Sequence, residues 1–193
     1  MKMVFLLFIS FVICQRLAEL MIARKNEKWM KENGAIEYGS KHYPAMVLIH
    51  IGFLVSVIFE VGYFNLELSP LWGMVLTGFI VTQLIRVWAL KSLGPFWNTK
   101  IIVLPGANII KEGPYRFIRH PNYLIVTLEL ILIPVLFQAY FTAILFTLCN
   151  FVILSIRIPL EEKALKEWTG YEMVFENNRR FLPHLKANKG RTS

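Results

Sequence analysis

Long apolar runs, broken by short polar stretches, dominate this chain. A helix needs about 20 apolar residues to cross the hydrocarbon core of a bilayer. Three runs of that length occupy residues 3–22, 43–64 and 70–90, and we predict a membrane-spanning helix at each. A cleaved signal peptide is the alternative for the first run, but that run lacks a small-residue cleavage site and contains Arg16 and Glu19.

A fourth apolar stretch, residues 123–156, is too long for one span and carries a single charge, Glu129. A straight helix of that length would measure about 50 Å, whereas the bilayer core is about 30 Å thick. We therefore predict a helical hairpin that turns near residues 138–140, with arms at 123–137 and 140–156.

The composition is that of a membrane protein. Hydrophobic residues make up 55% of the chain and charged residues 18%, and the mean hydropathy is +0.50. In soluble domains, apolar residues make up roughly 45–50% and charged residues about 25%. Cys14 and Cys149 both lie in apolar runs, so no disulfide framework is implied. Because no internal repeat or linker is visible, we expect one domain over residues 1–193, an all-α integral membrane helical bundle of about five transmembrane helices.

The net charge of +8 raises the question of a nucleic-acid partner, but the basic residues flank apolar segments instead of clustering on a water-facing domain. Residues 24–41 and 91–119 hold five Lys and Arg each, and residues 157–193 hold eight. By the positive-inside rule these segments are cytoplasmic. We expect membrane lipids as partners and no nucleic acid, and we expect residues 186–193 to form a disordered basic tail.

Several ionisable residues fall inside the predicted spans. Arg16 and Glu19 are three residues apart and share a helix face, and Arg86 and Glu129 are candidates for a pair between helices. Charges at membrane depth normally pair inside a bundle, since exposing them to lipid is costly. Two interpretations stay open: structural pairing, or a role in lining a substrate entry path. His50, alone on an apolar helix, is expected to be a hydrogen-bonded core residue.

Two polar stretches, residues 93–122 and 157–183, flank the hairpin, whose ends bring them together. The first contains Arg119 and His120 just before a helix start at Pro121, where backbone N–H groups and the helix dipole can hold an anion. The same stretch offers aromatic side chains able to hold a planar ring, namely Phe96, Trp97, Tyr115 and Phe117.

The second polar stretch places Arg157 and Glu161 one helical turn apart on one face. Arginine can grip a carboxylate bidentately, and glutamate can hold ribose hydroxyls or a cation. The sequence contains no strand followed by Gly-x-Gly-x-x-Gly, no P-loop, and no Cys or His cluster with metal-ligand spacing. We therefore predict no metal site, and a cofactor pocket built from helix ends and loops.

Residues 113–123, Gly-Pro-Tyr-Arg-Phe-Ile-Arg-His-Pro-Asn-Tyr, precede the hairpin, and Arg157-x3-Glu161-Glu162-x2-Leu165-x4-Gly170-Tyr171 follows it. Together these motifs resemble the isoprenylcysteine carboxyl methyltransferase family over roughly residues 93–183. The N-terminal half, with Arg16-Leu-x-Glu19, is more similar to a bacterial, alkylpyrone O-methyltransferase-like subgroup. The resemblance implies S-adenosyl-L-methionine as cofactor and a bacterial cell membrane, with the active site on the cytoplasmic side.

Carried over residue by residue, the resemblance implies a cofactor-binding set: Asn108, Ile109, Ile110, Tyr115, His120, Pro121, Asn122, Tyr123 and Glu161. It also implies that Arg157 faces the methyl acceptor. Residues 105–107, Pro-Gly-Ala, depart from the family pattern, which often has a more polar strip there.

The implied reaction is methyl transfer to an oxygen of a lipophilic substrate, such as a prenylated cysteine carboxylate or an alkylpyrone. A carboxylate is already ionised and needs no base, whereas an enol or phenol would use one such as Glu162 or His120. Two alternatives stay open. Related membrane scaffolds include NADPH-dependent reductases of the sterol-reductase type, and charges within the spans would also suit a non-enzymatic transporter subunit.

Overall fold

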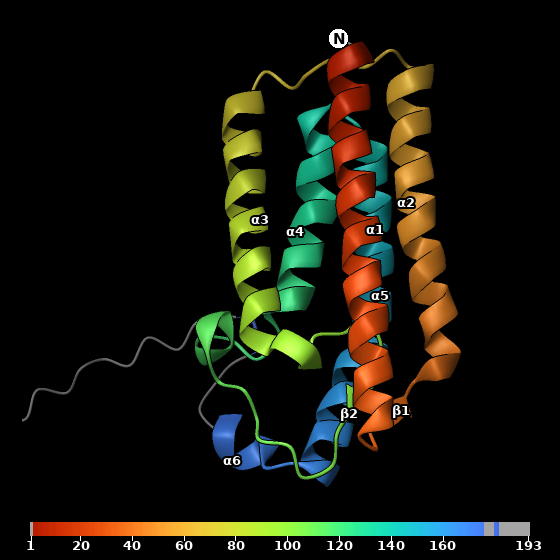
Figure 1. Ribbon diagram of the computed structural model, residues 1–193. Coiled ribbons are helices and arrows are strands. Elements are labelled where there is room, and N and C mark those ends of the chain that lie inside the picture. The colour runs from red at the N-terminus through yellow and green to blue at the C-terminus, as the bar shows by residue number, and fades with distance from the viewer. Residues whose placement is uncertain (1, 176–179, 182–193) are drawn as a thin grey trace, which may run out of the picture.

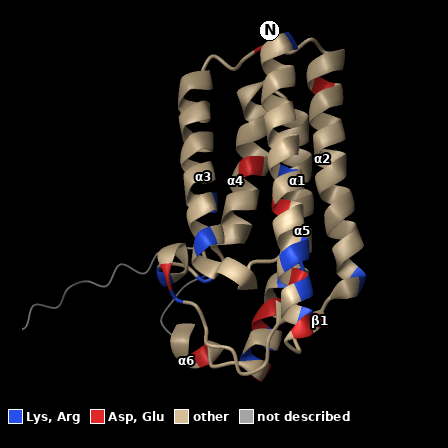
Figure 2. Cartoon of the chain, viewed as in Figure 1, with Lys and Arg blue, Asp and Glu red and all other residues tan. Residues whose placement is uncertain are grey.

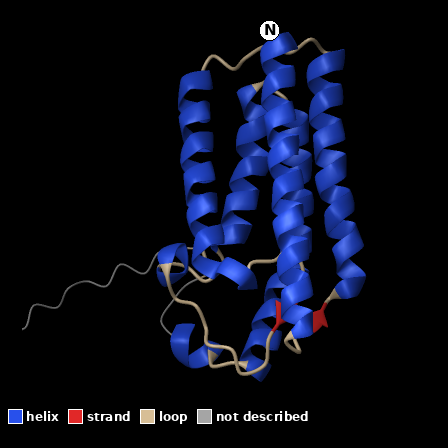
Figure 3. Ribbon diagram, viewed as in Figure 1, coloured by secondary structure: helices blue, strands red, loops and turns tan. Residues whose placement is uncertain are grey.

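The computed structural model describes residues 2–175 and 180–181. Over this part of the chain, long helices run side by side in one bundle (Figure 1): α1 (Lys2–Glu32), α2 (Tyr43–Tyr63), α3 (Trp72–Leu93), α4 (Pro121–Leu136) and α5 (Tyr140–Trp168). One end of the bundle, here called the polar end, carries the smaller elements (Figure 3): 3-10 turns η1 (Ser40–His42), η2 (Gly94–Phe96) and η3 (Gly113–Arg116), strands β1 (Ile36–Tyr38) and β2 (Ile101–Val103), and helix α6 (Tyr171–Phe175). The predicted all-α membrane helical bundle is confirmed.

Within residues 2–175 and 180–181, four helices are long and apolar enough to cross a bilayer, namely α1, α2 with η1, α3 with η2, and α5. They carry many exposed large hydrophobic side chains, as expected of surfaces that face lipid. Helix α4 is also apolar but has 16 residues, which is about 24 Å at the rise of an α-helix. Its role as a fifth span stays a prediction, as do the boundaries of the other spans.

Charged residues gather at the polar end. Figure 2 shows Lys, Arg, Asp and Glu concentrated there and thinly spread through the rest of the bundle. The same end holds the last turns of α1 and α5 and the connections before and after η2 and η3. The basic tail predicted for residues 186–193 lies outside the described residues.

Helices α1 and α5 continue beyond the apolar runs that predicted them. The predicted spans end at residues 22 and 156, whereas the helices end at Glu32 and Trp168. Both extensions are rich in Lys and Glu, which favour helix. Both also bury small or apolar side chains, such as Met30 and Ala164. We expected the basic segment at residues 24–41 to be a loop. That expectation is wrong for residues 24–32, because helix propensity persists where hydrophobicity stops.

The predicted hairpin is confirmed, with α4 and α5 joined by residues 137–139. Pro134 lies inside α4 and removes one backbone donor near its end. Gln138 adopts a left-handed φ of 59°, and the Ala139 amide donates to the Pro134 carbonyl at 2.9 Å. The chain thus reverses within three residues, and the hairpin delivers the start of α4 and the end of α5 to the polar end.

The half of the bundle away from the polar end is filled by a core cluster. Aromatic rings interlock there, with ring centroids 5.0 Å apart for Phe5 and Phe137 and 5.1 Å apart for Phe8 and Phe79. The buried members of this core cluster come from α1 to α4 and from the hairpin turn: Phe5, Ile9, Val12, Phe53, Val57, Val61, Val75, Phe79, Leu130, Ile133, Leu136, Phe137 and Ala139.

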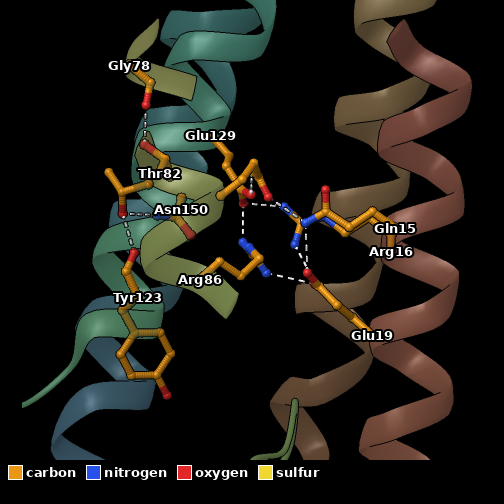
Figure 4. A network of polar contacts seen from close by, with 11 residues as sticks. Gln15, Arg16, Glu19, Gly78, Thr82, Arg86, Tyr123, Glu129 and Asn150 are labelled. Atoms are coloured by element: carbon orange, nitrogen blue, oxygen red, sulfur yellow. Dashed lines mark hydrogen bonds and ion pairs between the residues drawn. The ribbon is translucent and has the colours of Figure 1, made fainter. Parts of the chain in front are cut away.

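Between the core cluster and the polar end lies a charged network formed by Arg16, Glu19, Arg86 and Glu129 (Figure 4). Arg16 Nη1 and Arg86 Nη1 donate to the same Glu19 oxygen, at 2.9 Å and 2.7 Å. Both arginines also donate through Nη2 to one oxygen of Glu129. The two predicted pairs are confirmed, and each arginine additionally bridges both carboxylates.

Two glutamines complete the charged network. Gln15 Nε2 donates to Glu19 Oε1 at 2.9 Å and to Gln83 Oε1 at 2.6 Å. Gln83 Nε2 in turn donates to Glu129 Oε1 at 2.7 Å. Every carboxylate oxygen of the network therefore has a donor, and its two positive and two negative charges cancel. The network ties α1 to α3 and α4.

A short sheet that the sequence pattern did not predict closes the polar end. Strands β1 and β2 pair antiparallel, with Ile36 opposite Val103 and Tyr38 opposite Ile101. Beside the sheet, Lys100 Nζ lies 2.6 Å from Glu27 Oε1, which fixes the start of β2 to α1. Three-residue strands this far apart in sequence carry too little periodicity to be recognised.

The turn η3 depends on a glycine at its start. Gly113 has a φ of +53°, and a Cβ there would lie 2.0 Å from Ser92 Oγ and 3.0 Å from Trp88 Nε1. Gly106 also has a left-handed φ, +72°, but no atom lies within 4 Å of the position of its Cβ. At both positions the left-handed backbone conformation disfavours any residue with a Cβ. At Gly113 a Cβ would also overlap neighbouring side chains.

Replacing Glu129 with alanine leaves the buried Arg86 and the half-buried Arg16 with Glu19 as the one carboxylate of the network. Removing one partner of a buried ion pair typically costs about 3–5 kcal/mol, and we expect a loss of that size in the free energy of unfolding in detergent. The control is Glu32→Ala, which breaks the Lys28–Glu32 pair, whose side chains are 80% and 61% exposed. That change should cost less than about 1 kcal/mol; equal losses would contradict a stabilising network.

The two glycines form a matched pair for a second test. Gly106→Ala should lower the free energy of unfolding by about 1 kcal/mol through backbone strain alone. Gly113→Ala adds overlap with Ser92 and Trp88, and should cost about 3 kcal/mol in total. Unfolding in detergent measures both losses of free energy. If Gly113→Ala loses no more than Gly106→Ala, the side chains around η3 move aside at no cost and the predicted overlap is wrong.

Candidate functional site

A cavity of about 560 Å³ lies in the polar half of the bundle. The loop after β2, the η3 turn, the first turn of α4 and the extension of α5 form its wall at the polar end, and α1 and α2 form much of its wall within the bundle. Nine of the eleven residues predicted for the site line it: Asn108, Ile109, Ile110, Tyr115, His120, Asn122, Tyr123, Arg157 and Glu161. The structure places the remaining two, Pro121 and Glu162, behind this wall.

The helical turn between Arg157 and Glu161 lets both side chains reach the cavity from α5. The Tyr123 hydroxyl, from the first turn of α4, donates to Glu161 Oε2. This contact joins the two arms of the hairpin and orients the carboxylate. A glutamate held in this way can still accept further hydrogen bonds, since an ionised carboxylate has about four lone-pair sites.

Arg157 is buried, and the loop that contains Thr99 holds its guanidinium. Its Nη2 donates to the Thr99 carbonyl at 2.9 Å, and the Thr99 hydroxyl lies 3.3 Å from the Tyr43 hydroxyl. Arg157 Nε is buried without a hydrogen-bond partner in the described part of the chain. Such a donor is costly to bury unpaired, so the guanidinium is suited to receive an acceptor group from a ligand.

Two tyrosine hydroxyls in the cavity wall are also buried without hydrogen-bond partners among residues 2–175 and 180–181, those of Tyr115 and Tyr171. Burial raises the pKa of Tyr115 well above its ordinary value, and the negative charge of Glu161 adds to this effect. Burial likewise raises the pKa of Tyr171, with contributions from Glu162 and Glu161. Both phenols therefore stay protonated at neutral pH and remain hydrogen-bond donors.

Glu162 points away from the cavity, toward His120 and Arg180. The His120 ring Nε2 lies 3.0 Å from Glu162 Oε1, and Arg180 donates through Nε to Oε1 at 2.9 Å and through Nη2 to Oε2 at 2.7 Å. The backbone amide of His120 also donates to the Arg180 carbonyl at 3.2 Å. Glu162 thus positions His120, which itself lines the cavity.

Pro121 has a structural position at the first turn of α4. Its ring needs no amide donor there, and its fixed φ suits a helix start. His120 precedes it as the N-terminal cap residue. The first amides of a helix have no partner within the helix, so Asn122 and Tyr123 bring N–H groups as well as side chains to this part of the site.

Sequence reasoning missed some contributors. Thr99 and Tyr43 support Arg157 from a loop and from the start of α2, and no motif marks either residue. The structure also places the charged network and His50 in the cavity wall. His50 is hydrogen-bonded as expected, through Nδ1 to the Met46 carbonyl at 2.8 Å.

Comparison with known proteins identifies a family and two relatives. Residues 74–167 match the model of the isoprenylcysteine carboxyl methyltransferase family. The uncharacterized protein YpbQ of Bacillus subtilis (strain 168) is 48% identical over 165 residues, which cover 86% of this chain and 98% of that protein. An uncharacterized protein of Haemophilus influenzae is 28% identical over 155 residues, 80% of this chain and 90% of its own length. The chain belongs to the isoprenylcysteine carboxyl methyltransferase family.

Proposed function

We propose that this membrane methyltransferase uses S-adenosyl-L-methionine to methylate an oxygen of a lipophilic substrate. Family membership supports the general activity. The observation that carries the finer proposal is the continuity of one cavity. Its wall at the polar end holds the residues suited to the cofactor, and its wall within the bundle is largely apolar. A polar donor and an apolar acceptor can therefore meet in one space.

The residues present suit the chemical groups of S-adenosyl-L-methionine. Glu161 can accept from ribose hydroxyls, and the amides that open α4 can hold the carboxylate of the methionine part. Tyr115 supplies an aromatic face and a protonated hydroxyl. The same wall also contains one exposed and two half-buried side chains, those of Asn108, Ile109 and Ile110. When bound, the cofactor supplies an activated methyl group on a sulfonium.

Arg157 is suited to orient the acceptor. Thr99 fixes the guanidinium from behind, and its unpaired Nε can donate to an acceptor oxygen. If that oxygen belongs to a prenylated cysteine carboxylate, it is ionised, and correct placement supplies most of the rate. If it belongs to the enol of an alkylpyrone, His120 is the better base, because Glu162 has both oxygens engaged.

The two alternatives predict different ligands. An NADPH-dependent reductase needs basic residues for the 2′-phosphate, and Arg180, a candidate for that role, is paired with Glu162. A transporter subunit needs no cofactor.

Calorimetry on the detergent-purified protein separates these functions. We expect S-adenosylhomocysteine to bind and NADPH not to bind, because the site has an acidic group for ribose hydroxyls and its neighbouring Arg180 is already paired. Binding of NADPH alone would contradict the methyltransferase proposal and favour the reductase, and binding of neither ligand would favour the transporter.

Glu161→Ala should weaken S-adenosylhomocysteine binding about tenfold to a hundredfold, the value of one or two hydrogen bonds to a charged group. The same ligand titrated into Glu167→Ala is the control, since Glu167 is exposed on the same extension of α5. If the two variants bind equally well, Glu161 does not contact the cofactor.

Arg157→Ala should behave differently. We expect cofactor binding to change little and kcat to fall about a hundredfold, because misplacing the acceptor by about 1 Å can cost that much. The measurement is methyl transfer from labelled S-adenosylmethionine to S-farnesyl-cysteine and to an alkylpyrone. An unchanged kcat on whichever compound the wild type methylates would rule out an orienting role for Arg157.

A further inference from the structure

Two hydrogen-bond acceptors in the cavity wall have no donor. His50 of α2 and Asn150 of α5 both line the cavity within the bundle. Within residues 2–175 and 180–181, no group donates to His50 Nε2 or to Asn150 Oδ1. Asn150 is 1% exposed, and a buried acceptor that is left unpaired is costly. These two atoms therefore mark a polar position in a wall that is otherwise largely apolar.

The existing contacts of both residues fix which of their atoms stay acceptors. His50 Nδ1 lies 2.8 Å from the Met46 carbonyl, which can only accept, so Nδ1 carries the proton and Nε2 of the neutral ring has a lone pair. Thr127 Oγ1 donates to the Tyr123 carbonyl at 2.8 Å and receives the Asn150 Nδ2 donor at 2.9 Å. The amide of Asn150 is thereby oriented, with Oδ1 left as the acceptor.

The two residues lie at nearly the same depth, because α2 and α5 pack together and run antiparallel (Figure 1). Ser56 Oγ lies 2.7 Å from Thr142 Oγ1. One turn nearer the polar end, a Cβ at Gly52 would lie 3.3 Å from a ring carbon of Phe146. The same register places position 50 level with position 148, which is about 3 Å along the helix axis from position 150.

These acceptors lie further into the bundle than the residues that hold Arg157. Asn150 precedes Arg157 by seven residues on α5, and His50 follows Tyr43 by seven residues on α2, which is about 10 Å along each helix. Tyr43 and Arg157 are joined through Thr99. Both helices therefore give the same separation between two polar levels of one cavity.

The charged network does not supply the missing donor. Arg16 and Arg86 line the same cavity, and their charges act on the His50 ring. Their printed hydrogen bonds, however, go to the two carboxylates of the network. The donor for His50 and Asn150 has to come from what fills the cavity. A hydrocarbon tail brings none, and would leave both acceptors unpaired in an apolar space.

We propose that the methyl acceptor carries a hydroxyl group about 10 Å from the oxygen that is methylated, and that His50 and Asn150 bind this hydroxyl. This inference rests on the proposed function and names a further feature of the substrate. A hydroxyl has one proton, and rotation about its C–O bond lets it donate to either acceptor. A site built to hydrogen-bond a hydroxyl also rejects the analogue that lacks it, because its own polar groups then stay unpaired.

A series of substrates tests the position of the hydroxyl. For S-farnesyl-cysteine or an alkylpyrone, whichever the wild type methylates, each analogue carries one hydroxyl at a successive carbon of the chain. We expect kcat/KM to peak where the hydroxyl lies about 10 Å from the methylated oxygen, about tenfold above the unsubstituted compound, which is the value of one hydrogen bond. A flat series, or a loss at every position, would overturn the proposal.

Removing both acceptors tests the residues. The double variant His50→Phe with Asn150→Leu keeps side chains of similar size, and should lower the ratio of kcat/KM, best hydroxylated over unsubstituted compound, from about ten to about one. The matched control is Thr147→Val on α5. The Thr147 hydroxyl is also buried without a partner in the described part of the chain, but it does not line the cavity. The control should keep the wild-type ratio, and an unchanged ratio in the double variant would contradict the assignment.

NMR of isotope-labelled histidine ring nitrogens gives a readout that needs no turnover. The His50 signal is the one that is missing in His50→Phe. We expect the His50 Nε2 signal of the wild type to shift when the best hydroxylated analogue is added, and to stay in place with the unsubstituted compound, because only the former brings a donor.

The outcomes separate this subsite from the proposed function. If the wild type methylates an acceptor but shows no preference for a hydroxyl and no response at His50, the subsite is wrong and the proposed function stands. If no compound is methylated, the proposed acceptors are wrong, and the NMR titration with the alkylpyrone series decides the subsite alone. A shift that depends on the hydroxyl then supports it, and the absence of a shift overturns it.

Discussion

Two arginines and two glutamates form one charged network inside the bundle, between α1, α3 and α4. Each arginine bridges Glu19 and Glu129, and Gln15 and Gln83 donate to the remaining carboxylate oxygens. Such groups are costly in an apolar medium unless they are paired. Their pairing therefore fixes the depth of α1 against α3 and α4. With that register set, the aromatic core cluster packs on one side of the network, and the cavity forms on the other.

The cavity follows from the way in which the hairpin ends. Pro134 and the left-handed Gln138 make α4 short and reverse the chain sharply. As a result, the start of α4 and the extension of α5 meet at the polar end, where Tyr123 contacts Glu161 and His120 contacts Glu162. The two glutamates are adjacent in sequence and face opposite ways. Glu161 reaches the cavity. Glu162 contacts His120, the residue before the first turn of α4, on the side away from the cavity.

The charged network has a second consequence for the proposed chemistry. It lines part of the cavity, and residues of the core cluster line the cavity's end within the bundle. The same four charged residues therefore join the helices and form part of the cavity wall. The two interpretations of the intramembrane charges that the sequence left open are thus compatible.

The sequence by itself determined the helical class and the hairpin. Apolar runs must become helices in lipid, since only internal hydrogen bonds satisfy the backbone there, and the spacing of Arg157 and Glu161 already places them on one face. Only the tertiary structure decided the rest. Pairing of β1 with β2, the support of Arg157 by Thr99, and the turning of Glu162 away from the cavity all depend on contacts between segments far apart in the chain. Local periodicity carries no record of such contacts, because they form only when the helices are packed at one register.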